Sequence, residues 1–155
     1  MLEESSKLVD NWIIILLTIA LFGLAYLLFK IFRLGPKVGQ IVSICGIIVF
    51  LIAIVICMIA KLDLKMDSKG VSFTYPPFLN QKEVYLWSDI KSIELVKFDA
   101  MTEFGGWGNK HSSKFGNGYL TSGKFGLCIT NTKLEKTTVT VLDTLKAKEI
   151  ISLYH

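Results

Sequence analysis

Residues 12–29 have the sequence WIIILLTIALFGLAYLLF and residues 38–60 have the sequence VGQIVSICGIIVFLIAIVICMIA, and neither stretch contains a charged side chain. A helix rises about 1.5 Å per residue, so about 20 residues cross a hydrocarbon core of about 30 Å. Because lipid cannot satisfy backbone polar groups, such segments are expected to be helical. The sequence therefore predicts a transmembrane hairpin of two helices over residues 12–60.

The segment between these two stretches has the features of a turn at a membrane surface. Gly35-Pro36 ends the first helix because proline cannot continue its hydrogen bonds. Lys30 and Arg33 can extend their charged ends toward the headgroups. Two other interpretations fit less well: a chain of 155 residues has no room to bury two helices that are apolar all round, and a signal peptide does not begin with an acidic segment such as MLEESSKLVDN.

Basic residues are nearly balanced between the turn and the other ends of the two stretches, so the positive-inside rule does not orient the hairpin. Cys45 and Cys57 lie in the second stretch and Cys128 lies in a predicted strand, which leaves no disulfide framework. This use of cysteine is consistent with a reducing cytoplasm. We therefore predict an integral protein of a bacterial inner membrane, with its soluble domain in the cytoplasm.

After Lys61 the apolar pattern changes from continuous to alternating. Leu62, Leu64 and Met66 alternate with polar residues, and similar runs recur as far as residue 142, separated by turn signals. This pattern predicts about seven antiparallel strands. Beyond it, four apolar side chains fall on one face of a C-terminal helix: Ala147, Ile150, Ile151 and Tyr154.

The sequence thus predicts a membrane α-hairpin joined to a mainly-β, α+β soluble domain. Residues 1–11 form an N-terminal tail, residues 12–60 form the hairpin, and residues 61–155 form the soluble domain. Small residues near helical spacing would permit close helix approach, namely Gly23 with Ala20, and Gly39 with Ser43 and Gly46. Ordinary glycine use in membrane helices explains them at least as well. Association of copies through the hairpin is therefore possible in this prediction, without a defined stoichiometry.

A glycine-rich segment over residues 99–118 interrupts the strand pattern. A second, overlapping stretch, from Phe104 to Leu134, contains no acidic residue. Basic side chains interleaved with aromatic ones suit an anionic membrane surface or lipid headgroup. The predicted binding residues are Trp107, Lys110, His111, Lys114 and Lys124. In the alternative interpretation, Trp107 and Phe115 plug the sheet domain and the lysines are only solvated. The sequence leaves both open.

Four blocks resemble a small family of bacterial pleckstrin-homology-like membrane proteins with two N-terminal transmembrane helices: Trp87–Leu95, Glu103–Gly108, Gly118-Tyr119 and Ser122–Leu127. The likeness covers nearly the whole chain. It implies a PH-like barrel closed by the C-terminal helix, together with a membrane address. It implies no particular activity, because this fold hosts lipid, peptide and protein binding alike.

Residues typical of catalysis or metal binding do not cluster in the sequence. His111 and His155 are the only histidines, and no phosphate-binding loop, dinucleotide fingerprint or nucleophile motif occurs. Asp99 and Glu103 are the kind of carboxylates that usually lie on a solvated surface. A net charge of +4 is too small and too dispersed for nucleic-acid binding. We predict no catalytic residues, no metal and no cofactor.

Two functions from different classes follow from these patterns. The first is a membrane-anchored, non-catalytic binding module that recruits a protein partner or contacts anionic lipid. The second is a membrane effector whose β-barrel senses a small ligand and whose two helices then disrupt the bilayer, an outline found in some antiphage proteins. An enzyme would need a site that the sequence does not contain.

Overall fold

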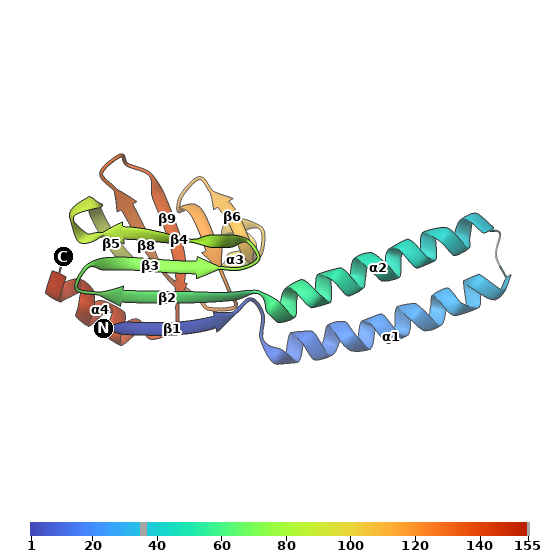
Figure 1. Ribbon diagram of the computed structural model, residues 1–155. Helices are drawn as coiled ribbons and strands as arrows, with labels where there is room; N and C mark the ends of the chain where they lie inside the picture. Colours follow the sequence, from blue (N-terminus) through green and yellow to red (C-terminus); the bar gives the residue numbers. More distant parts are fainter. Residues whose placement is uncertain (35–36, 155) are drawn as a thin grey trace. The chain divides into compact units, whose positions relative to one another are not determined.

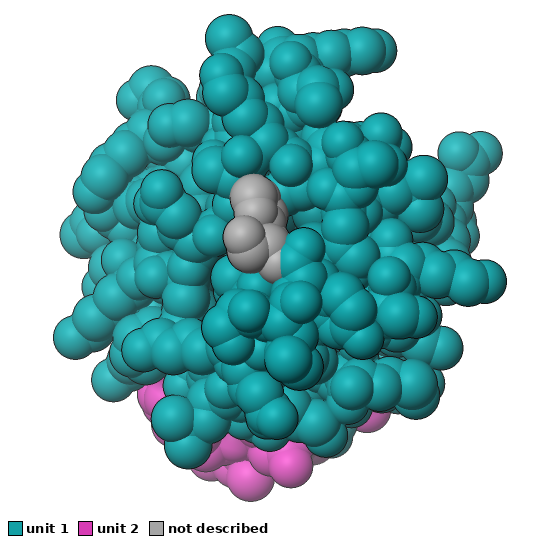
Figure 2. All heavy atoms as spheres, turned by 90° about the vertical axis from the view of Figure 1, so that its left-hand side faces the viewer, with its two compact units in different colours: residues 1–8, 60–155 teal, residues 9–59 magenta. Residues whose placement is uncertain are grey.

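The computed structural model describes residues 1–34 and 37–154 of the chain. They form two compact units, which Figures 1 and 2 show: a helical unit of Val9–Ile59 and a sheet unit of Met1–Leu8 with Ala60–His155. The first residues of the chain therefore belong to the sheet unit and are not a separate tail. The predicted turn at Gly35-Pro36 lies outside the described residues.

The helical unit consists of α1 (Asn11–Leu34) and α2 (Lys37–Ile59), which run antiparallel against each other (Figure 1). Large apolar side chains cover its outside, including Phe22, which is 72% exposed. Among the described residues, one segment is long and apolar enough to cross a membrane, Asn11–Lys30. The described apolar part of α2, Ile44–Ile59, is shorter than the length needed to cross a membrane.

Close approach of the two helices does not depend on the two glycines whose surroundings are described. A Cβ atom built on Gly23 or Gly46 would meet nothing within 4 Å. Of the two interpretations, ordinary glycine use is therefore the one that fits Gly23 and Gly46 in this pair of helices.

The first sheet of the sheet unit has the strand order β1-β2-β3-β4, and all its pairs are antiparallel. Alternating burial in β2 and β3 confirms the predicted period of two. The sequence analysis missed the first strand because only Leu2 and Ser6 are buried in it and the rest is polar. The strands are β1 (Leu2–Lys7), β2 (Lys61–Asp67), β3 (Gly70–Tyr75) and β4 (Leu79–Leu86).

The second sheet has the order β5-β8-β9-β7-β6. Its strands are β5 (Ile90–Lys97), β6 (Gly108–Ser112), β7 (Gly116–Leu120), β8 (Phe125–Asn131) and β9 (Lys136–Val141). The prediction of about seven antiparallel strands in a barrel is corrected in three respects. Among the described residues there are nine strands, β7 and β9 run parallel, and the two sheets are not closed into a barrel.

The two sheets pack on a shared core and are also joined by buried polar contacts. The Tyr75 hydroxyl donates to the Leu120 carbonyl at 2.6 Å, and the Thr121 hydroxyl donates to Ser6 Oγ at 3.2 Å. The Phe73 ring lies against Tyr119 with a centroid separation of 4.9 Å. Because Phe73 and Tyr75 are almost completely buried, these contacts fix the faces of the two sheets against each other.

Three short helices complete the sheet unit: η1 (Trp87–Asp89), α3 (Ala100–Phe104) and α4 (Thr144–Tyr154). The C-terminal helix is present as predicted, and its Asp143 carboxylate accepts from the Lys146 amide at 3.0 Å. Of the four side chains predicted on its apolar face, Ala147 and Ile150 are buried, Ile151 is half-buried and Tyr154 is exposed. The Tyr154 ring stacks on Trp87 at 5.7 Å. Helix α4 packs on an edge strand of each sheet, β1 of the first and β5 of the second.

Candidate functional site

The glycine-rich segment of residues 99–118 is folded, and α3 is its first element. Asp99 caps this helix, because its carboxylate accepts from the Met101 amide at 2.9 Å and from the Thr102 amide at 3.0 Å. Glu103 Oε2 in turn accepts from the Asp99 amide at 3.1 Å. The hydrogen bonds from Thr102 and Met101 hold the pKa of Asp99 below its usual value, so the carboxylate is charged at neutral pH.

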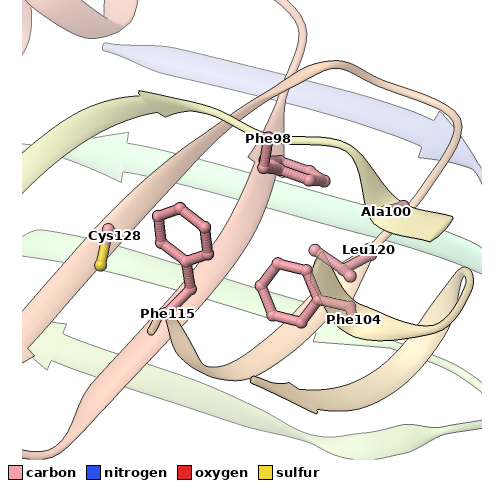
Figure 3. Packing of buried hydrophobic residues seen from close by; sticks show 6 residues of the cluster. All are labelled: Phe98, Ala100, Phe104, Phe115, Leu120 and Cys128. Atoms are coloured by element: carbon pink, nitrogen blue, oxygen red, sulfur yellow. The ribbon is translucent and has the colours of Figure 1, made fainter. Parts of the chain in front are cut away.

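An aromatic cluster lies beneath α3 and holds it against the second sheet. Figure 3 shows the rings of Phe98, Phe104 and Phe115 together with the side chains of Ala100, Leu120 and Cys128. Phe104 stacks on Phe115 at 5.8 Å and meets Phe98 edge-on at 5.7 Å. Gly118 leaves room for this packing, since a Cβ there would lie 2.5 Å from the Phe104 ring.

Above this cluster is a cavity of about 560 Å³ between α3, the end of β5 and the loop that precedes β8. Small-molecule sites are commonly about 300–1,000 Å³, so the volume suits a small ligand or a headgroup. Trp107 packs half-buried against the cluster and also lines the cavity. The charged residues of the lining are Lys97, Asp99, Glu103 and Lys124.

The five residues predicted to bind an anionic surface do not form one site. Trp107 and Lys124 line the cavity. Lys114 does not line it but pairs with the cavity residue Glu103: its ammonium lies 3.3 Å from Glu103 Oε1 and 4.5 Å from the centroid of the Phe115 ring. Lys110 and His111 are exposed on β6, where His111 Nδ1 lies 3.0 Å from Asn117 Oδ1. The alternative interpretation, in which Trp107 and Phe115 plug the sheet domain, agrees with the burial of Phe115. It agrees only in part with Trp107, which is half-buried.

Three of the four charged residues of the cavity were not among the predicted binding residues. Lys97 ends a predicted strand, and nothing in its sequence context distinguishes it from other surface lysines. Asp99 and Glu103 were assigned to solvated surface. Their spacing of four residues is one longer than that of a capping box, so the sequence did not indicate the reciprocal hydrogen bonds that bring both carboxylates to one place.

A second, smaller cavity of about 390 Å³ adjoins the same strand and is lined by Lys97, Lys114 and Lys136 with Glu94. Two of these lysines have partners within the protein, because Lys136 donates to the Lys114 carbonyl at 3.3 Å and Lys114 pairs with Glu103. In the larger cavity the carboxylates of Asp99 and Glu103 also have partners within the protein, whereas Lys97 and Lys124 form no ion pair among the described residues.

Within residues 1–34 and 37–154, no three histidine, cysteine or acidic side chains come close enough to hold a metal ion. Comparison with known protein families, with curated proteins and with solved structures gives no match to this chain.

Proposed function

We propose that this protein is a membrane-anchored, non-catalytic binding module, whose sheet unit contacts lipid headgroups or a protein partner at the membrane surface. The anchor in this proposal is the helical unit, with both α1 and α2 crossing the bilayer. The observation that carries the proposal is the pairing of β1 with β2, the two strands that precede and follow that unit in the sequence.

This pairing restricts how many times the chain can cross a membrane. Residues Lys7 and Lys61 are direct partners in the β1–β2 ladder, and the Leu8 amide donates to the Ala60 carbonyl at 3.1 Å. The chain therefore leaves the sheet unit and returns to it at one place, on one side of any bilayer. The intervening segment must cross an even number of times, so a crossing by α1 requires a return crossing by α2.

The surface of the helical unit supports the same proposal. Along Asn11–Lys30, none of the most apolar window is buried, and Ile41 and Val49 of α2 are 62% and 67% exposed. Exposure of so much apolar surface is unfavourable in water, whereas contact with lipid hydrocarbon removes that cost. Copies of the hairpin could also associate through these faces.

A relationship to the bacterial PH-like membrane proteins stays a prediction of the sequence. It is supported by a run of short strands followed by one C-terminal helix. The parallel β7–β9 pair and the two separate sheets are departures from the expected arrangement. We propose lipid or protein ligands and no nucleic acid, because the basic residues are dispersed and the main cavity carries carboxylates as well as lysines.

Impermeant thiol labelling of the full chain in sealed membrane vesicles tests the anchoring. Native Cys128 is buried and unsuitable as a reporter. The three cysteines are therefore replaced by alanine, and single cysteines are introduced as Glu3→Cys in β1, Ser113→Cys between β6 and β7, and Lys37→Cys at the start of α2. All three positions are exposed.

The proposal predicts that Glu3→Cys and Ser113→Cys label from one side and Lys37→Cys from the opposite side. Labelling of Glu3→Cys and Ser113→Cys from opposite sides would overturn it. So would recovery of the protein in the soluble fraction without detergent.

A further inference from the structure

The larger cavity carries charges of both signs that are not paired with each other. Lys97 and Lys124 approach it from β5 and from the loop before β8, and Asp99 and Glu103 approach it from α3. In the part of the chain that the structure describes, neither lysine forms an ion pair with these carboxylates within 4 Å. Side chains of opposite charge thus line the same cavity without forming an ion pair across it.

A ligand that carries only one sign of charge fits this lining poorly. A simple anion attracted by the lysines would also meet the carboxylate of Asp99 and that of Glu103, which is already paired with Lys114. A simple cation would meet the two ammonium groups of Lys97 and Lys124. A molecule with an anionic group and an ammonium group a few bonds apart can satisfy both sets. The half-buried ring of Trp107 adds an aromatic wall of the kind that binds ammonium groups.

The position of the cavity in the sheet unit indicates where such a ligand would come from. The cavity loop Ser122–Lys124 follows Thr121, whose hydroxyl bonds to Ser6 in β1. Ser6 is two residues before Leu8, where the chain leaves the sheet unit, and Figure 1 shows α3 at the end of the sheets where β1 ends and β2 begins. Within the proposed function, this end is tethered within reach of lipid headgroups.

We infer that the cavity between α3 and Ser122–Lys124 binds a phospho-amine zwitterion, the chemistry of a phosphoethanolamine headgroup. The phosphate lies against Lys97 and Lys124, and the ammonium lies against Asp99, Glu103 and the Trp107 ring. This inference rests on the proposed function for its lipid source, whereas the recognition chemistry is the same for a soluble phosphoethanolamine compound.

Isothermal titration of the full chain in a non-ionic detergent tests the chemistry, with glycerophosphoethanolamine as the probe. Glycerophosphate and ethanolamine are the single-charge controls. We expect the zwitterion to bind at least tenfold more tightly than either control. We expect Lys97→Gln and Lys124→Gln each to weaken it about tenfold or more, the effect of losing a charge-assisted contact. The matched control is Lys133→Gln, in the β8–β9 turn outside the cavity.

A second arm identifies the source. The full chain is placed in lipid nanodiscs that contain phosphatidylethanolamine or only phosphatidylglycerol, and amide hydrogen exchange is measured over α3 and Ser122–Lys124. Slower exchange only in the ethanolamine discs, lost in Lys124→Gln and retained in Lys133→Gln, supports a lipid source. Binding of the soluble probe without this protection supports a soluble source.

The inference is overturned if neither arm shows binding, if glycerophosphate binds as tightly as the zwitterion, or if Lys133→Gln weakens binding as much as Lys124→Gln. Such a result leaves the membrane anchoring to be judged by thiol labelling alone. The two proposals can therefore fail separately.

Discussion

The four strands of the first sheet pair in the order in which they occur in the chain, whereas the five strands of the second sheet pair in the order β5-β8-β9-β7-β6. The first sheet is interrupted between its first two strands by the whole helical unit, and it holds both ends of that segment. The second sheet is continuous in sequence with α3, and the cavity is lined by the end of β5, by α3 and by the neighbouring loops. In the proposed function, attachment therefore involves the first sheet, and binding involves elements connected to the second sheet.

Particular side chains join the two sheets, which makes this division open to experiment. A change within the second sheet should affect the cavity while leaving the β1–β2 pairing in place, and a change at the contacts should loosen both. The following expected effects run from the largest to the smallest and refer to the full chain in detergent micelles.

Phe104→Ala removes the central ring of the cluster beneath α3. Phe104 is buried and touches the rings of both Phe98 and Phe115, so we expect the free energy of unfolding to fall by about 3–5 kcal/mol. Phe78→Ala is the control, because Phe78 is 37% exposed and lies in the turn between β3 and β4 of the first sheet. Denaturant titration followed by circular dichroism measures both. Equal losses would show that the cluster has no special role in the second sheet.

Tyr75→Phe removes the hydroxyl that donates to the Leu120 carbonyl between the two sheets. This leaves a buried acceptor without that donor, so we expect a loss of about 1–3 kcal/mol in the same titration. The control is Tyr119→Phe, where the ring contact with Phe73 is retained and the hydroxyl is only partly buried. A loss for Tyr119→Phe as large as for Tyr75→Phe would contradict the assigned contact.

Glu4→Ala tests the contact between β1 and the start of α4. The Glu4 carboxylate accepts from the Leu142 amide at 2.9 Å and from the Asp143 amide at 3.0 Å, as a capping side chain does. We expect a loss of about 0.5–2 kcal/mol. Glu3→Ala, at the neighbouring exposed position, should change the free energy of unfolding much less. If the two variants match, β1 does not hold α4 through Glu4.

We expect acid to lower the stability of the protein through two carboxylates, Asp67 in the first sheet and Asp99 next to the second. Backbone hydrogen bonds, from Lys69 to Asp67 and from Thr102 to Asp99, lower the pKa of both groups in the folded protein. Their stabilisation is therefore present above the unfolded value, near 3.8, and is lost as the pH falls through the folded value. Melting temperatures of Asp67→Asn and Asp99→Asn should depend less on pH between 5 and about 2 than that of the native protein. Unchanged pH dependence in both variants would contradict these assignments.

The sequence predicted best the elements whose pattern is local. The apolar stretch of α1, the alternation in β2 and β3, and the buried face of α4 each contain their own signal, and each is confirmed. The missed strands β1 and β6 are mostly polar, and their pairing depends on partners elsewhere in the chain. Long-range pairing leaves no periodic signal in the strand itself.

The candidate site was predicted less completely for a related reason. Interleaved lysines and aromatics pointed to Trp107 and Lys124, which line the cavity, and also to Lys110 and His111, which do not. The pattern located basic residues in the sequence but could not show that α3 brings Asp99 and Glu103 to the same hollow. That juxtaposition depends on helix capping and on the aromatic cluster.

Disulfide cross-linking in intact membranes tests most directly whether β1 pairs with β2 around the helical unit. In a cysteine-free background, the double variant Ser5→Cys/Asp63→Cys places thiols at directly opposed positions of the β1–β2 ladder. The pair Ser5→Cys/Thr74→Cys is the control, because Thr74 lies one strand further away, opposite Asp63. The account predicts rapid intramolecular cross-linking of the first pair and none of the second; absence of the first cross-link, or equal rates for both pairs, would contradict it.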